Sequence, residues 1–224
     1  LIGNVRLALS PDGEHLIGVN PIANLLFTLR RNPVSGVLSG ADGAGGTEVF
    51  EQVLRKGGTP AVVELDIPAD VMVSSDNRHV LVASASTSGP IGPLVAFSRR
   101  APPPQLGFLE LDRQGDTIPL TQDTIDDLTA PTDVVVRGRH VYSISLADAA
   151  ITRFERRSAQ IGLEDDDGQH LTHKKVWRNG ENGIVNMTRP ERLLLSPDGK
   201  SLFVTSLDGD SLVVELSTGN SGDT

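Results

Sequence analysis

Four similar segments recur along this chain at a spacing of about 60 residues, and this repeat limits the possible folds more than any other feature. In each segment, one short apolar run precedes a turn and a second apolar run follows it. Two of the turns read Ser-Pro-Asp-Gly, a type I signal in which proline presets the backbone and glycine relieves it. Each segment therefore predicts a β-hairpin. The four segments are Arg6–Leu16, Asp70–Val80, Asp133–Val141 and Arg192–Leu202.

Two further strands follow the hairpin in each of the first three repeats. The third strand ends in arginine, at Arg31, Arg99 and Arg156, and the fourth ends near Arg55, Arg113 and Arg178. Four antiparallel strands per repeat describe a blade of a β-propeller, so we predict an all-β propeller with four blades. The last blade is incomplete and stops after its third strand. The expected repeats cover residues 4–66, 67–129, 130–186 and 187–216, and residues 217–224 form a linker-like tail.

The repeat resembles the YVTN-type, lactonase-like (6-phosphogluconolactonase-like) propeller family. The resemblance rests on the Ser-Pro-Asp-Gly turns, on Phe203-Val204-Thr205-Ser206 in the second strand, and on Leu29-Arg30-Arg31-Asn32-Pro33. It implies a ring of more than four blades, a channel lined by the first strand of each blade, and a periplasmic or extracellular location. Some family members hydrolyse a sugar lactone at the channel mouth. No catalytic residue of the family can be matched here position by position.

An arc of four blades leaves sheet edges and apolar blade faces without cover. We therefore expect these blades to belong to a larger propeller, or a protein partner to complete them. The alternative is a compact four-bladed ring.

Composition excludes several classes of function. The chain has 20 Lys and Arg against 29 Asp and Glu, a formal charge of −9, which argues against nucleic-acid binding. There is no cysteine, and no apolar run is long enough to span a membrane. We predict no cofactor.

One position of the repeat is charged in all four blades and carries our candidate ligand-binding residues. In the resembled family this position lies on the strand that lines the channel, so the four side chains would form a ring at its mouth. The alternative is that Arg6–Asp70 and Asp133–Arg192 are salt bridges between blades, the more common use of paired charges. The four residues are Arg6, Asp70, Asp133 and Arg192.

Other polar residues carry weaker signals. His15, His79 and His140 recur at one repeat position, but they lie on different blades and are not expected to share a metal. Acidic turns at Asp165–Asp167 and at Asp208 and Asp210 could hold calcium but lack the spacing of a known loop. The arginines that end the third and fourth strands are interpreted as edge charges that discourage pairing.

No nucleophile elbow, zinc-protease motif or phosphate-binding loop is present. The primary prediction is a non-catalytic propeller that offers a binding or assembly surface to a protein or a small ligand. One alternative is a lactonase-like hydrolase acting at the channel mouth. A second is an accessory propeller domain of a larger redox or secreted protein.

Overall fold

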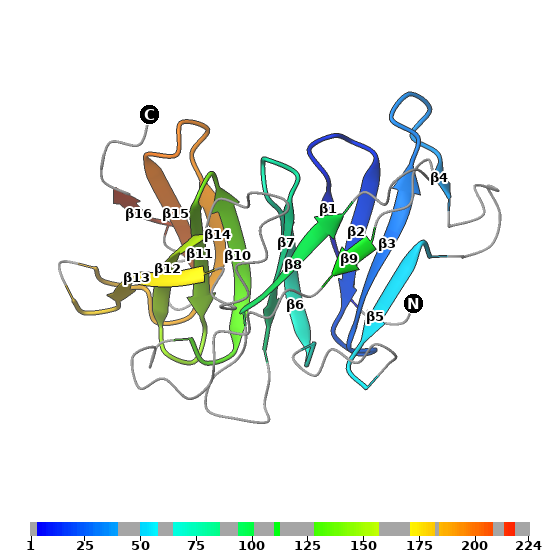
Figure 1. The fold of residues 1–224 in the computed structure, drawn as a ribbon. Coiled ribbons are helices and arrows are strands. Elements are labelled where there is room, and N and C mark those ends of the chain that lie inside the picture. The colour runs from blue at the N-terminus through cyan, green and yellow to red at the C-terminus, as the bar shows by residue number, and fades with distance from the viewer. Residues whose placement is uncertain are drawn as a thin grey trace.

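The computed structural model describes residues 4–39, 50–57, 65–85, 94–100, 110–112, 128–156, 171–181, 184–207 and 213–217. Within these ranges the chain forms strands β1 to β16 and no helix (Figure 1). The strands make four antiparallel sheets, which follow one another in sequence and in space. The predicted all-β class is confirmed.

The sheets are referred to as blades I to IV. Blade I contains β1 (Arg6–Leu9), β2 (His15–Asn20), β3 (Leu25–Arg31), β5 (Gln52–Arg55) and the short β4 (Leu38–Ser39). Blade II contains β6 (Pro68–Val73), β7 (His79–Ser84), β8 (Leu94–Arg100) and β9 (Glu110–Asp112). Blade III contains β10 (Pro131–Arg137), β11 (His140–Ser145), β12 (Ala150–Arg156) and β13 (Leu171–Arg178). Blade IV contains β14 (Pro190–Leu195), β15 (Ser201–Ser206) and β16 (Val213–Ser217).

The predicted hairpins form in every blade. Two details differ from the prediction. Strand β4 adds a second pairing to the end of β3, and β16 runs one residue into the segment expected to be a tail. The third repeat has a two-residue turn, because Arg137 pairs directly with His140.

The serine of each longer turn fixes the hairpin. In blade II the Ser74 hydroxyl donates to Asp76 at 2.6 Å and accepts the backbone N–H of His79 at 2.9 Å. Glycine stands at the left-handed position of the blade I turn, with φ of 72° at Gly13, and Asn77 takes this position in blade II with φ of 67°. Asparagine tolerates this conformation better than most residues, so the blade II turn keeps its shape without glycine.

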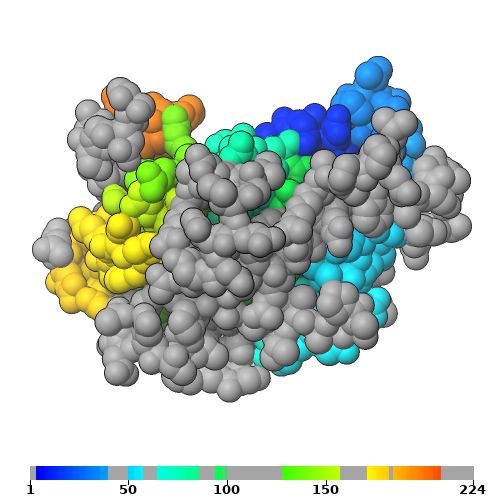
Figure 2. Space-filling model, in the orientation of Figure 1, coloured from blue at the N-terminus to red at the C-terminus, as the bar shows by residue number. Residues whose placement is uncertain are grey.

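The hydrophobic core lies between the blades. Each of three apolar clusters joins one blade to the next, and their members include Ile17, Ala83 and Val135, respectively. The inner strands β1, β6, β10 and β14 lie side by side and pack along their length (Figure 1). Figure 2 shows the described residues of the four blades in succession along the upper rim of the molecule, from blade IV to blade I. A blade cannot bury both of its faces alone, so this stacking supplies the core.

Candidate functional site

A pocket of about 240 Å³ opens where the four inner strands begin, and we call it the channel-mouth pocket. Its lining contains residues of every blade, with three arginines and one carboxylate among them. Arg189 is fixed through its backbone, since its N–H donates to the Ser206 hydroxyl at 3.1 Å and its carbonyl accepts the N–H of Leu207. The lining residues are Arg6, Ala69, Thr132, Leu146, Arg189, Pro190, Glu191, Arg192 and Leu207.

The four charged residues predicted from the repeat occupy equivalent places on the inner strands. Arg6 pairs with Val19 across its hairpin, and Asp70, Asp133 and Arg192 each pair with the corresponding residue of their own blade. The structure brings Arg6 and Arg192 to the channel-mouth pocket. Asp70 and Asp133 lie on the two strands between them and do not line it. Whether these residues bind a ligand stays a prediction.

The two aspartates bond mainly to the backbone of the following blade. Asp70 Oδ2 accepts the N–H of Val134 at 3.2 Å, and Asp133 Oδ2 accepts the N–H of Leu193 at 2.7 Å. The Val134 N–H also donates to Asp133 Oδ1 at 3.0 Å. Each carboxyl group therefore holds the inner strand of the next blade in position, a role that the sequence alone did not indicate.

The carboxyl groups of Asp70 and Asp133 lie close enough to interact, and a hydrogen bond between them requires a proton on one of the two. Burial raises the pKa of Asp70 to about 8, and the neighbouring Asp133 adds to the rise. Burial also raises the pKa of Asp133, although its hydrogen bonds and the charge of Arg6 oppose this. Two carboxylates this close do not both ionise near neutral pH.

Only one of the two predicted salt bridges between blades forms. Arg192 Nη1 lies 4.0 Å from Asp133 Oδ1, the outer limit for an ion pair. The expected Arg6–Asp70 pair is wrong: among the described residues no hydrogen bond or ion pair joins the two side chains, and the charge of Arg6 acts on Asp133 instead. The reason is that Asp70 is already engaged by Val134 and Asp133.

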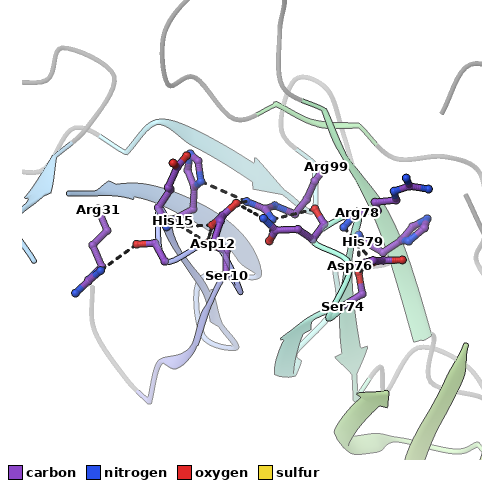
Figure 3. Close-up of polar contacts among 12 residues, drawn as sticks. Ser10, Asp12, His15, Arg31, Ser74, Asp76, Arg78, His79 and Arg99 are labelled. Carbon is purple, nitrogen blue, oxygen red and sulfur yellow. Dashed lines mark hydrogen bonds and ion pairs between the residues drawn. The ribbon is translucent and has the colours of Figure 1, made fainter. Parts of the chain in front are cut away.

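At the hairpin-turn end of the blades, arginines form a second set of contacts between blades (Figure 3). Arg156 of blade III donates to Asp76 Oδ2 of blade II at 2.6 Å and to His79 Nδ1 at 2.9 Å. It also donates from Nε to the Gly138 carbonyl of its own turn at 2.6 Å. Arg99 of blade II makes the same contacts with Asp12 at 3.4 Å and His15 Nδ1 at 3.3 Å of blade I. We call each of these an Arg–Asp–His joint.

These joints correct the interpretation of Arg99 and Arg156 as edge charges. The arginines end the third strands, β8 and β12, which are not edges because β9 and β13 pair beyond them. The sequence contained part of the clue, since Asp12 and His15 recur in the second repeat as Asp76 and His79, and an arginine ends the third strand of each full repeat.

The histidines serve different blades and do not converge. Asp12, Glu14 and His15 place ligand atoms within 4.8 Å of one another, but the guanidinium of Arg99 already occupies Asp12 and His15. The acidic runs Asp165–Asp167 and Asp208–Asp210, named above for calcium, lie outside the described residues.

No family model matches the sequence, and no curated protein sequence matches it. Solved structures do resemble it. A provisionally named 6-phosphogluconolactonase from Bacteroides fragilis is 17% identical, with a TM-score of 0.56 over 95% of this chain and 53% of that one. A periplasmic gluconolactonase from Pseudomonas aeruginosa is 16% identical, with a TM-score of 0.53 over 98% of this chain and 58% of that one.

This chain has a lactonase-like β-propeller fold. The same architecture matches a chain of the Mitotic Checkpoint Complex at 11% identity, with a TM-score of 0.52 over 96% of this chain and 48% of that one. Identities this low show the fold alone. The chain spans about half the length of each of these structures. Among the described residues there is no helix long and apolar enough to cross a membrane.

Proposed function

We propose that this chain is the substrate-binding arc of a propeller that hydrolyses sugar lactones, with an anionic lactone held in the channel-mouth pocket. The observation that carries the proposal is the charge of that pocket. Arg6, Arg189 and Arg192 meet a single carboxylate there, Glu191, in a chain whose formal charge is −9. Arginine is the side chain best suited to carboxylate and phosphate groups, because its planar fork binds two oxygens at once.

The size of the pocket supports a small substrate. Its volume of about 240 Å³ is just below the range of roughly 300–1,000 Å³ typical of small-molecule sites. A single sugar ring is a better match for this volume than an oligosaccharide. The solved structures named for lactonases make a sugar lactone the favoured class, ahead of the non-catalytic binding role predicted from the sequence.

The proposed reaction needs three functions from the pocket. Water adds to the lactone carbonyl carbon and gives up a proton to Glu191, while an arginine stabilises the oxyanion that develops. The bond from that carbon to the ring oxygen then breaks, and the ring oxygen receives the proton and becomes a hydroxyl group. The product is an open-chain sugar acid, which releases a proton to solvent at neutral pH.

Titration of released acid under pH-stat control tests this proposal, with glucono-δ-lactone and its 6-phosphate as substrates. We expect hydrolysis above the spontaneous rate, and a fall of about 100-fold in kcat/KM for Arg192→Ala, the loss of one preorganised donor. Arg139→Ala is the matched control, because Arg139 is half exposed and pairs with Glu155 away from the pocket. A spontaneous rate with both substrates, together with no calorimetric binding of 6-phosphogluconate, would overturn the proposal.

A binding or assembly module is the second candidate. It is favoured by the use of Asp70 and Asp133 as backbone acceptors, which leaves them unavailable to a substrate. Binding of the sugar acid without any hydrolysis of the lactone would select this candidate. The accessory-domain reading and the absence of a cofactor stay predictions.

For location we propose the periplasm or the extracellular space. The support is the description of the Pseudomonas aeruginosa structure as periplasmic. Fractionation of cells that express the natural gene, with an antibody against this chain, tests it.

A further inference from the structure

The inner strand of three blades contains a β-bulge at the same place. In blades II, III and IV the hairpin register skips one residue of β6, β10 or β14, between a proline and the charged residue of the repeat. The skipped residue has no partner across the hairpin, and a bulge of this kind aims the extra side chain in a new direction. The three skipped residues, which we call the bulge row, are Ala69, Thr132 and Glu191.

A buried proline precedes each member of the bulge row. These prolines are Pro68, Pro131 and Pro190, each the first residue of its strand. Proline suits this place because it has no N–H to donate to the sheet, and its ring fixes φ. The bulge row is therefore carried by restrained backbone on strands, which holds a binding site more precisely than a loop does.

All three members of the bulge row line the channel-mouth pocket. Blades II and III contribute their bulge residue to this pocket and not the aspartate that follows it, because Asp70 and Asp133 bond to the backbone of the next blade. Blade IV contributes both Glu191 and Arg192. On the two inner strands between Arg6 and Arg192, the bulge row and not the charged repeat position thus determines what a ligand meets.

The Thr132 hydroxyl is the polar group of the bulge row that lacks a partner. Its Oγ1 is buried and makes no hydrogen bond among the described residues, although the side chain as a whole is partly exposed. Buried hydroxyl groups without a partner are uncommon in native proteins, and each one calls for an explanation. Rotation about χ1 exchanges the hydroxyl and the methyl group of threonine between staggered positions. The hydroxyl can therefore turn toward a ligand in the pocket that supplies the missing partner.

The hydrogen-bonding groups of the pocket limit the class of ligand. Arginine only donates, an ionised glutamate only accepts, and a threonine hydroxyl does both. A carboxylate or a fully ionised phosphate group uses the arginines but has no proton to give to Glu191 or Thr132. A ligand that carries hydroxyl groups beside its anionic group uses all of these side chains. Ala69 presents only a methyl group, so it adds neither charge nor a bulky chain to the pocket.

We propose that the bulge row selects a hydroxylated acid, with the Thr132 hydroxyl bonded to a hydroxyl group on the carbon chain of the ligand and Ala69 leaving room for that chain. Thr132 and Ala69 are then specificity-determining residues. The inference rests on the proposed function, in which this pocket holds a sugar lactone. It adds the residues that distinguish such a ligand from other acids of the same length and charge.

Isothermal titration calorimetry of the full chain with two six-carbon acids tests the proposal. Gluconate carries a hydroxyl group on every carbon beyond its carboxylate, and hexanoate carries none. We expect the natural protein to bind gluconate at least about 10-fold more tightly than hexanoate. Thr132→Val keeps the shape of the side chain and removes the hydroxyl, so it should weaken gluconate binding about 10-fold and leave hexanoate binding unchanged. Thr132→Ser keeps the hydroxyl and should retain gluconate binding.

A charge placed in the bulge row gives a second arm. Ala69→Asp adds a carboxylate to the pocket, and we expect it to weaken the binding of both acids by about 10-fold or more. The matched control is Ala23→Asp in the exposed turn between β2 and β3, which lies outside the pocket lining and should change neither affinity. Thermal melts separate selection from folding, because the loss of an unpartnered hydroxyl should not lower the melting temperature of Thr132→Val.

Equal affinity of the natural protein for the two acids would overturn the inference, as would the absence of gluconate binding. A Thr132→Val protein that binds gluconate as the natural protein does, or that loses both acids equally, would overturn it too. The proposed reaction is judged separately, by the release of acid from the lactones. Gluconate binding with the expected loss in Thr132→Val, but without hydrolysis, would support the role of the bulge row and contradict the reaction.

Discussion

Arg156 donates from Nη2 to Asp76 Oδ2 at 2.6 Å across the joint between blades III and II, with only 5% of its side chain exposed. The same guanidinium reaches His79 and the Gly138 carbonyl, so one side chain connects two blades and its own hairpin. Because arginine stays protonated, His79 must accept at Nδ1 and carry its proton on Nε2.

Replacing this arginine with lysine should destabilise the protein. Arg156→Lys keeps the charge but loses the fork that serves three acceptors, and we expect a loss of about 3 kcal/mol in the free energy of unfolding, measured with urea. The control is Arg139→Ala, whose half-exposed ion pair with Glu155 should contribute less than about 1 kcal/mol. Equal effects of the two substitutions would mean that the buried joint adds nothing beyond a surface pair.

The carboxyl pair between blades II and III should make stability depend on pH. The pKa of Asp70 rises from its ordinary 3.8 to about 8 on folding, so the native state holds more protons than the unfolded chain between these values. Stability must therefore fall as pH rises from about 4 to about 8.

Asp70→Asn should remove much of that dependence. The asparagine amide oxygen can accept the Val134 N–H and its NH₂ group can donate to Asp133, without any proton to lose. We expect Asp70→Asn to be more stable than the natural protein by about 2 kcal/mol at pH 8, and the advantage to shrink towards pH 5. Paired urea titrations at both pH values measure the difference. An advantage that grows on acidification would have the wrong sign for this account.

Gly18 should resist any larger residue because of Phe27. A Cβ at position 18 would lie 2.6 Å from Phe27 Cε1 and 2.8 Å from Leu7 Cδ2, which is too close for either contact. We expect Gly18→Val to cost about 1–3 kcal/mol by overpacking. Combining it with Phe27→Leu should recover part of the loss if the ring is the obstacle, and thermal melts of the two variants decide this.

The turn serines should differ in value according to burial. Ser74 is fully buried, and its hydroxyl serves both Asp76 and His79, so Ser74→Ala should cost about 1–2 kcal/mol. Ser196 makes the same bonds in a more exposed turn, so Ser196→Ala is expected to cost less than Ser74→Ala. Urea denaturation of the pair checks the order, and a larger loss at Ser196 would contradict it.

The blades could be predicted from the sequence because their signals are local. A hairpin is defined by its turn residues and by the apolar runs beside them, as in Ser196-Pro197-Asp198-Gly199. The channel-mouth positions of Arg6 and Arg192 followed from the repeat and from the resembled family. The separation of the histidines onto different blades followed from the same repeat.

The contacts between blades could not be predicted in the same way. The partner of Arg156 lies 80 residues away in the sequence, and no pattern within one blade states that the arginine reaches backwards to Asp76. The mutual hydrogen bond of Asp70 and Asp133 depends on the spacing of two inner strands, which the blade packing determines. The sequence alone therefore favours two separate ion pairs for Asp70 and Asp133, and it does not indicate that the two carboxyl groups lie together.

The direction of the Arg–Asp–His joint has a consequence for how such a chain can grow. In a blade that has both residues, the later arginine is placed to reach the preceding blade, and the turn aspartate is placed to accept the arginine of the following blade. A tandem duplication of blade II would thus link to its own copy with no new residue. Blade III lacks the turn aspartate, and residue 218, where blade IV would need its arginine, is threonine. Both halves of the joint between blades III and IV are therefore missing together, and Arg137 bonds to the Ser196 carbonyl there instead.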